Sequence, residues 1–503
     1  MFNNFHGSEM ADKYHQWKIA HRLNKNQLPT RSLKVAIAIA VALLVWFLPP
    51  SLYGLPEINP VEQRVAGVFL FAAIMWLTEP IPAWTTSMAV VVVLLFCTSN
   101  SGFFFFQECD GVKYENLVKN VDILHCFADP TIMLFIGGFV LAIAATKSGL
   151  DVKLAKVLLA PFGTKSENVL LGFLLITALF SMFMSNTATA AMMLTFLAPV
   201  LRDLPADGKG KIGLALAIPI GANIGGIGTP IGTPPNTIAM KYLNDPEGMN
   251  LGIGFGNWML VMVPFVIILL IISWYLLKTM FPFKQKKIEL KIEDNHKSDW
   301  RNIVVYITFA ITILLWVSDQ FTGINANVVA MLPVGVFAVS GVLVKRDLEQ
   351  ISWSILWMIA GAFAIGVALQ ESGLGAHMIA AIPFDQWSPL MVVIGSGLLC
   401  WLMANFISHT ATAALFMPIL AIAAVPMQSQ LAGLGGVSTL LIGVALSSSL
   451  SMLLPISTPP NAMADATGFI PQKAMLRTGL IMGITGLVLG YVILILCGSN
   501  GIL

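Results

Sequence analysis

Charged residues are scarce in this chain, and their scarcity excludes a large water-soluble core. Asp, Glu, Lys and Arg make up only 11% of the 503 residues, whereas 57% are hydrophobic. A soluble domain usually has about a quarter of its residues charged. Long apolar runs recur along the whole chain, and many reach the roughly 20 residues that a helix needs to cross a bilayer. The composition therefore predicts an all-α polytopic membrane protein embedded in the lipid bilayer.

Motifs of enzymes and metal centres are missing as well. The apolar runs contain no His-Glu-x-x-His, Gly-x-Ser-x-Gly or paired-Asp pattern, which argues against an intramembrane enzyme. The net charge is +2, and its distribution gives no indication of a nucleic-acid partner. We therefore expect neither an enzyme nor an organic cofactor.

The cysteines show no spacing typical of metal ligands. They are Cys97, Cys109, Cys126, Cys400 and Cys497. Cys109 and Cys126 fall in one polar loop, so they either pair there or remain thiols without a role.

Positive charge marks the expected cytoplasmic side of the chain. Lys and Arg cluster in residues 21–34, 209–211 and 284–297, and such clusters favour the cytoplasm. The expected segments are a cytoplasmic part over 1–32, a first anchor helix over 33–62 and a cytoplasmic basic linker over 284–300. We expect the protein in a cell membrane, either inner or plasma membrane. Counting spans from these segments places the N-terminus on the cytoplasmic side and the C-terminus on the extracytoplasmic side.

Two apolar segments, 167–200 and 386–421, are too long for a single membrane span. A helix of 34 residues would measure about 50 Å, whereas the hydrocarbon core is about 30 Å thick. Polar triplets interrupt both segments, SNT at 185–187 and SHT at 408–410. We therefore expect two re-entrant hairpins with the triplets at their tips, because non-helical backbone at membrane depth must be buried in protein or line a cavity.

Two further apolar segments, 212–240 and 434–465, are predicted to be broken helices. Prolines interrupt them, Pro230, Pro234 and Pro235 in the first and Pro455, Pro459 and Pro460 in the second. Proline removes a backbone donor and clashes with the preceding turn. Broken membrane helices offer free carbonyls and helix N-termini, which bind ions in transporters.

These features repeat along the chain at a nearly constant distance. The matches are TKSGL at 146–150 with QESGL at 370–374, SNT with SHT, and TPPN at 233–236 with TPPN at 458–461, which lie 224, 223 and 225 residues apart. We interpret residues 63–283 and 301–503 as two repeats within about 11 transmembrane helices plus the two hairpins. An odd number of spans in each repeat would invert one relative to the other, as in secondary transporters with a site near the membrane midplane.

The polar groups at the tips and breaks suit an anion and a hard cation. Hydroxyls and amides can hold a carboxylate, and their oxygens can coordinate Na⁺ together with freed carbonyls. Because few Arg or Lys side chains lie in the apolar runs, bound cations and helix N-termini must offset the charge of an anion. A purely structural role, the close packing of helices through small residues, explains one such motif but not its duplication. A passive anion channel is also disfavoured, because a channel needs a continuous pore lining.

At these motifs the sequence resembles the divalent anion/sodium symporter family, which includes di- and tricarboxylate and sulfate carriers. The resemblance extends from about residue 35 to the end of the chain and rests on MSNTATAAMM, GTPIGTPPN and STPPNA. It implies two inverted repeats, a scaffold that forms a homodimer, a moving transport domain and elevator-type alternating access.

The resemblance also implies roles for individual residues. One substrate carboxylate would be held by Ser185, Asn186 and Thr187, and the opposite end by Ser408, His409 and Thr410. The walls of the site would be Thr233, Pro234, Thr458 and Pro459. A first Na⁺ would be held by Ser181, Ser185, Asn186 and the Gly232 carbonyl, and a doubtful second Na⁺ by Ser408 and Ser457.

His409 departs from the family pattern, which has asparagine there. It either donates a hydrogen bond to substrate in a carrier that is still coupled to sodium, or replaces a cation and shifts the carrier toward proton coupling or exchange, or has little consequence. We expect import of C4-dicarboxylates (succinate, malate, fumarate) coupled to Na⁺. The alternative is dicarboxylate exchange, or transport of citrate or sulfate with altered cation coupling.

Overall fold

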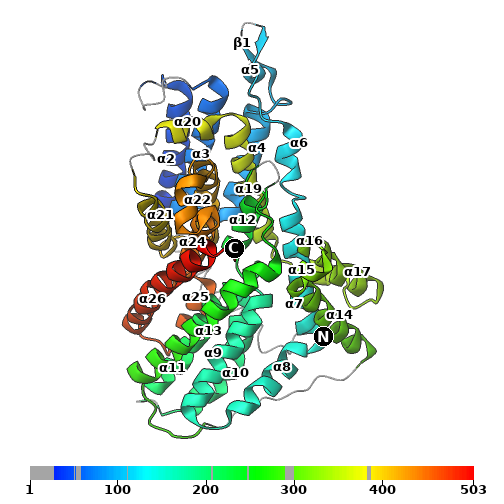
Figure 1. The fold of residues 1–503 in the computed structure, drawn as a ribbon, viewed down its shortest axis with the longest axis vertical. Coiled ribbons are helices and arrows are strands. Elements are labelled where there is room, and N and C mark those ends of the chain that lie inside the picture. Colours follow the sequence, from blue (N-terminus) through cyan, green and yellow to red (C-terminus); the bar gives the residue numbers. More distant parts are fainter. Residues whose placement is uncertain are drawn as a thin grey trace.

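The computed structural model describes residues 28–49, 51, 58–109, 111–205, 208–245, 248–288, 299–381 and 387–502. These residues are mostly helical, and a two-stranded antiparallel sheet, β1 (Glu108–Cys109) with β2 (Val112–Lys113), lies in a loop at one end of the molecule (Figure 1). Within the described ranges, eight helices are long and apolar enough to cross a membrane, or nine if one bent pair counts as a span. The prediction of a polytopic helical membrane protein is confirmed.

The first half of the chain forms the helices that follow. They are α2 (Leu28–Phe47), α3 (Pro60–Thr78), α4 (Ala83–Cys97), α5 (Phe104–Gln107), α6 (Asn120–His125), α7 (Pro130–Ser148), α8 (Leu150–Leu159), η3 (Ala160–Phe162), α9 (Ser166–Phe183), α10 (Asn186–Asp203), α11 (Gly210–Gly226), α12 (Pro234–Leu243) and α13 (Phe255–Met280). Cys109 lies in β1 and Cys126 directly follows α6, and the two are not joined by a disulfide.

The second half repeats much of this order. Its helices are α14 (Trp300–Val317), α15 (Asp319–Thr322), α16 (Ala326–Val329), α17 (Met331–Val339), α18 (Lys345–Leu348), α19 (Trp353–Glu371), α20 (Leu374–Ala381), α21 (Pro389–Ala404), α22 (His409–Ala424), α23 (Gln428–Leu431), η5 (Ala432–Leu434), α24 (Gly436–Ser449), α25 (Pro459–Ala466) and α26 (Gln472–Ser499). Several expected spans are short or interrupted, such as the 15-residue α4, which is why fewer than 11 helices qualify as full spans.

The anchor helix is shorter than the expected segment 33–62. α2 ends at Phe47, ahead of two prolines in the sequence that cannot continue it. α3 then begins at Pro60, where the Asn59 side chain caps its N-terminus and Glu62 completes a capping box. Residues 60–62 therefore belong to the second helix. Residues 1–27 and most of the basic linker, 289–298, lie outside the described part of the chain.

Each long apolar segment consists of two helices that meet at its polar triplet. α9 and α10 join at Met184 and Ser185, and α21 and α22 join through residues 405–408. Both second helices begin with a serine N-cap, because the Ser185 and Ser408 hydroxyls accept hydrogen bonds from the backbone N–H groups three residues later. The expected breaks are also present, between α11 and α12 and between α24 and α25.

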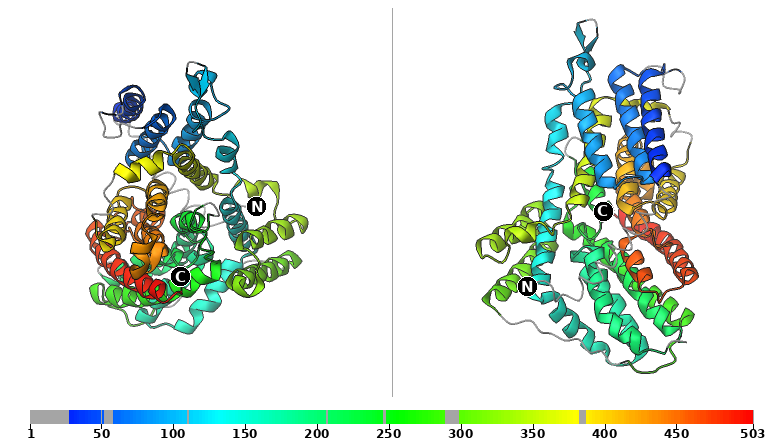
Figure 2. Two further views of the ribbon diagram at one scale, coloured as in Figure 1. Left: turned by 45° about the horizontal axis from the view of Figure 1, so that its top comes forward. Right: turned by 180° about the vertical axis from the view of Figure 1, so that it is seen from behind.

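The two halves pack into each other at these interruptions. α12 packs on α22 and α24 of the second half, while α25 packs on α10 and α11 of the first. The green helices of the first half therefore lie beside the orange and red helices of the second in every view (Figure 2). This interdigitation brings the two tips and the two breaks into one region.

Helices α7 and α19 run antiparallel beside this region. At the end of α7, Lys147 Nζ lies 2.6 Å from Asp347 Oδ2, which precedes α19. At the end of α19, Glu371 Oε2 accepts a hydrogen bond from Lys119 N, which precedes α6 and α7. Each helix therefore ends next to the segment that leads into the other.

We predict that Gly137→Ala destabilises the protein. A Cβ at Gly137 would overlap the Ala330 carbonyl oxygen, so α7 and α16 would have to separate, and such overpacking typically costs about 1–3 kcal/mol. Thermal unfolding in detergent measures the effect. Gly138→Ala is the matched control, because its Cβ would meet only the Ile231 side chain at 3.5 Å or beyond. Equal melting temperatures for the two variants would contradict the prediction.

Candidate functional site

Four helices begin in the region where the two halves meet. They are α10, α12, α22 and α25, with the N-caps Ser185, Thr233, Ser408 and Thr458. The N-terminus of a helix carries a partial positive charge and unpaired N–H groups, which favour an anion. The sequence predictions placed every substrate contact at these four helix starts.

Oxygen atoms gather around Gly226 in the first half. The Asn186 Oδ1 atom and the Gly232 carbonyl oxygen lie 2.6 and 3.0 Å from the position that a Cβ on Gly226 would occupy. The Ser181 hydroxyl lies 2.6 Å from Asn186 Oδ1 and 2.8 Å from the Ala222 carbonyl oxygen. We call the oxygens of Ser181, Asn186, Ala222 and Gly232 the first oxygen cluster.

The first oxygen cluster fits a hard monovalent cation. Its members are neutral hydroxyl, amide and carbonyl oxygens, the ligand types that hard cations prefer. Two of these oxygens, Asn186 Oδ1 and the Gly232 carbonyl oxygen, approach Gly226 so closely that a larger residue would not fit at position 226. Three of the four residues predicted to hold the first Na⁺ belong to it, whereas the fourth, Ser185, uses its hydroxyl to cap α10.

The equivalent position in the second half has a different chemistry. His409 corresponds to Asn186, and its Nε2 atom lies 2.7 Å from the Ser451 carbonyl oxygen. Ser451 in turn corresponds to Gly226, so the second half has a side chain where the first half has none. Ala404 corresponds to Ser181 and has no hydroxyl. Three substitutions therefore remove the features that make the first cluster suitable for a cation.

The two serines predicted for the second cation are engaged separately. Ser408 Oγ accepts a hydrogen bond from Ala411 N as the cap of α22. Ser457 Oγ donates to the Asn405 carbonyl and accepts from Leu454 N. The bond from Ser457 to Asn405 holds the tip between α21 and α22 against the second break.

The predicted substrate residues differ in their exposure. Ser185, Asn186, Thr187, Pro234 and Ser408 are half-buried, Thr233, His409, Thr410 and Thr458 are buried, and Pro459 is exposed. All of them lie on the two tips or the two breaks. The structure therefore places the whole predicted set at the junction of the two halves.

Two asparagines that the sequence showed only as parts of TPPN stabilise the breaks. Asn236 Nδ2 donates to carbonyls at Gly226, Ile227 and Thr229, at 3.1, 3.3 and 2.8 Å. Asn461 Nδ2 donates to carbonyls at Met452 and Leu454, at 2.9 and 3.1 Å. These carbonyls have lost their helical partners. The repetition of TPPN was the signal that could have identified this role.

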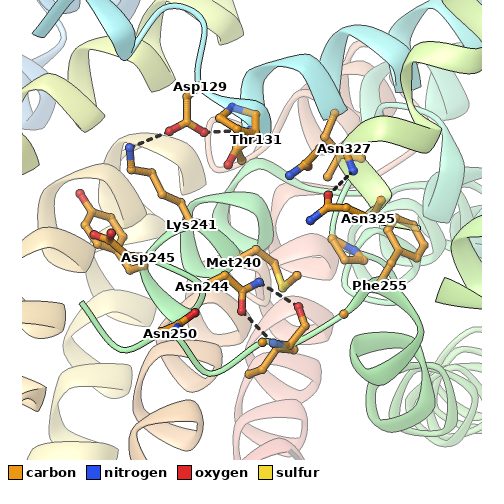
Figure 3. Close-up of a pocket in the computed structure, with 18 of the residues that line it drawn as sticks. Asp129, Thr131, Met240, Lys241, Asn244, Asp245, Asn250, Phe255, Asn325 and Asn327 are labelled. Atoms are coloured by element: carbon orange, nitrogen blue, oxygen red, sulfur yellow. Dashed lines mark hydrogen bonds and ion pairs between the residues drawn. The ribbon is translucent and has the colours of Figure 1, made fainter. Parts of the chain in front are cut away.

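A large cavity lies beside this region and not within it. It has a volume of about 770 Å³ and lies between α12 and the helices α7, α16 and α19. Figure 3 shows Lys241 of α12 pointing to Asp129 at the start of α7, with Nζ 2.8 Å from Oδ2. Of the two breaks, only Pro230 lines this cavity. Sequence reasoning missed Lys241, which is a single charge at the end of an apolar helix.

We predict that Gly226→Ala abolishes cation binding at the first oxygen cluster. Binding of an ion at about 100 times its Kd stabilises a folded protein by about 2.7 kcal/mol. Unfolding of the purified protein should therefore shift to higher temperature when Na⁺ replaces choline, and the variant should lose this shift. Gly395→Ala is the control, since no described atom lies within 4 Å of its new Cβ. A full Na⁺ shift in Gly226→Ala would refute the assignment.

The sequence of this chain is similar to the sequences of known membrane transporters. The chain is 26% identical over 501 residues to the sodium-dependent dicarboxylate transporter SdcS of Staphylococcus saprophyticus, covering 92% of both chains. It is 29% identical over 498 residues to the protein of the same name from Staphylococcus aureus, covering 90% of both.

Two solved structures share the fold, each with a TM-score of 0.53. They are the YdaH transporter of Alcanivorax borkumensis (12% identity, 83% of this chain and 97% of that one) and MtrF of Neisseria gonorrhoeae, described as an antimetabolite efflux pump (13% identity, 86% and 97%). The family described as citrate transporters matches residues 73–434. The chain is therefore a multi-pass membrane transporter and not an enzyme, and it belongs to the citrate transporter family, of the divalent anion/sodium symporter type that its motifs resemble.

Proposed function

We propose that the protein is a secondary active transporter that imports C4-dicarboxylates such as succinate, malate and fumarate together with Na⁺. The observation that carries this proposal is the first oxygen cluster, placed at the start of α10. The names of the two staphylococcal relatives, sodium-dependent dicarboxylate transporters, support the same substrates and the same ion.

In the described part of the chain, the two tips and the two breaks carry no Arg or Lys that could bind a dianion at the junction. Four helix N-termini supply partial positive charge, and a Na⁺ at the first oxygen cluster supplies a full one. Burying an anion without such compensation would be very costly. Substrate and Na⁺ therefore bind more tightly together than apart, which couples their transport.

Each of the two tips would bind one end of the substrate. Ser185, Asn186 and Thr187 would hold one carboxylate, with Asn186 also contacting Na⁺. Ser408 and Thr410 would hold the other carboxylate, beside His409. The substrate would lie between the walls of the two breaks, Thr233 with Pro234 and Thr458 with Pro459.

Cation coupling would rest on the first half. The first oxygen cluster groups several oxygen atoms beside Gly226, whereas His409, Ser451 and Ala404 replace the equivalent groups in the second half. We therefore favour one Na⁺ site of this type per chain and no equivalent second site.

Movement would follow an elevator mechanism. The tips and breaks (α9–α12, α21, α22, α24 and α25) would move as one unit against a scaffold that includes α7 and α19. The antiparallel course of α7 and α19 supports inverted repeats. The cavity between α12 and α7 and the Lys241–Asp129 ion pair lie at the proposed sliding surface. We expect a homodimer in a cell membrane, with the N-terminus in the cytoplasm and the C-terminus outside.

Uptake of labelled succinate into proteoliposomes tests this function. We expect uptake only with an inward Na⁺ gradient, because Na⁺ offsets the charge of the dianion. Choline in place of Na⁺ and liposomes without protein are the controls. Uptake that needs no Na⁺ but requires internal succinate would favour exchange. Failure of every C4-dicarboxylate to compete with a transported label would refute the substrate class.

Dicarboxylate exchange is the second candidate, and the geometry of His409 favours it. Because Nε2 lies against a carbonyl, this nitrogen carries a hydrogen and a neutral ring presents Nδ1 as an acceptor only. Nδ1 could donate to a carboxylate only after protonation, and the ring would then supply the charge that a second cation would otherwise supply. Such a carrier would depend less on Na⁺.

We predict that rebuilding the second half raises Na⁺ dependence. His409→Asn restores an amide oxygen, and the triple variant Ala404→Ser, His409→Asn, Ser451→Gly also restores the hydroxyl and the glycine. The Na⁺ dependence of succinate uptake should increase in the single variant. It should increase further in the triple variant, with a Hill coefficient higher by about one, since this coefficient is limited by the number of sites. Unchanged Na⁺ dependence in both would show that residue 409 has little influence on coupling.

A further inference from the structure

One buried asparagine connects the two repeats at their breaks. Asn223 lies in α11 of the first repeat with 1% of its surface exposed. Its Nδ2 atom donates to Thr458 Oγ1 at 3.2 Å and to Asn461 Oδ1 at 3.1 Å, both in the second repeat. These bonds join residues more than 230 positions apart in the chain.

This contact restricts what the Thr458 hydroxyl can do. A hydroxyl has one hydrogen to donate and two lone pairs that accept. Thr458 Oγ1 accepts from Asn223 Nδ2 and from Asn461 N, at 3.2 Å each. Both acceptor positions are then in use, and the hydroxyl can offer only its hydrogen. A carboxylate, which only accepts hydrogen bonds, is the complementary partner.

The first repeat lacks the equivalent bridge. Ser448 corresponds to Asn223, and its shorter side chain leaves Oγ buried without a hydrogen-bond partner among the described residues. Asn236 Oδ1, the counterpart of Asn461 Oδ1, likewise has no partner in the described part of the chain. The Thr233 hydroxyl does not cap α12, whereas Thr458 caps α25. The Thr233 hydroxyl is therefore not restricted to donating its hydrogen, as the Thr458 hydroxyl is.

We propose that Asn223 is a positioning residue that fixes the Thr458 hydroxyl as a hydrogen-bond donor for one carboxylate of the substrate. The substrate end at the second break must then present a hydrogen-bond acceptor, such as a carboxylate oxygen, whereas the end at Thr233 tolerates other acceptors or donors. This inference rests on the proposed dicarboxylate transport and adds a reason for unequal recognition of the two ends.

Exchanging the two equivalent residues tests the inference. The variants are Asn223→Ser, Ser448→Asn and the double exchange, measured for KM and maximal rate of succinate uptake in proteoliposomes. Asn223→Ser should raise KM roughly tenfold, the effect of losing an oriented hydrogen bond to a charged group, with the maximal rate within about twofold. Ser448→Asn should lower KM because it provides the missing bridge to Asn236. The double exchange should return KM toward the wild-type value.

Further measurements distinguish a positioning role of Asn223 from a folding defect and from failure of the proposed transport function. Asn223→Leu keeps the size of the side chain but removes the amide, and it should raise KM as Asn223→Ser does. The Na⁺-dependent rise in melting temperature should persist in every variant, because the first oxygen cluster is intact. Unchanged KM in Asn223→Ser and Asn223→Leu would overturn the inference. If neither folds, a KM in Ser448→Asn that is unchanged or raised would overturn it. Absence of wild-type uptake would instead overturn the proposed function.

Discussion

The need to satisfy backbone carbonyls freed inside a membrane protein governs the centre of this structure. Each break removes helical hydrogen bonds where lipid supplies no replacement. Asn236 and Asn461 provide the replacement, each with one amide that donates to carbonyls within its own break, and Asn236 also donates to the Gly226 carbonyl at the end of α11. The breaks are therefore ordered, and the helix starts beyond them can serve a ligand.

The hairpin tips depend on these ordered breaks. In the first half, Asn186 Oδ1 and the Gly232 carbonyl oxygen both approach Gly226, so the tip and the break together form an oxygen cluster. In the second half, His409 lies against the carbonyl of Ser451. The tip of the first half thus presents an amide oxygen to its break, whereas the tip of the second half presents an imidazole. The two halves therefore share sequence motifs at their tips and breaks but differ in the side chains that lie there.

Much of the architecture could be predicted from residue patterns. Prolines located both breaks, and the length of the apolar segments predicted an interruption in each, which the structure has at Ser185 and Ser408. Boundaries were less accurate, as in the anchor helix, because the Asn59 cap that starts α3 depends on a local hydrogen bond with Glu62. The contact between Asn223 and Thr458 could not be predicted, since only the packing of α11 on α25 brings them together.

The sequence by itself determined the class of protein, the two repeats and the residue types at the tips and breaks. Hydropathy, chain length and the chemistry of proline act locally, so they can be deduced without coordinates. Only the tertiary structure decided which oxygens gather around Gly226 and which groups His409 and Asn223 contact. Those distances arise from the interdigitation of the two halves, which joins residues that are far apart in the chain.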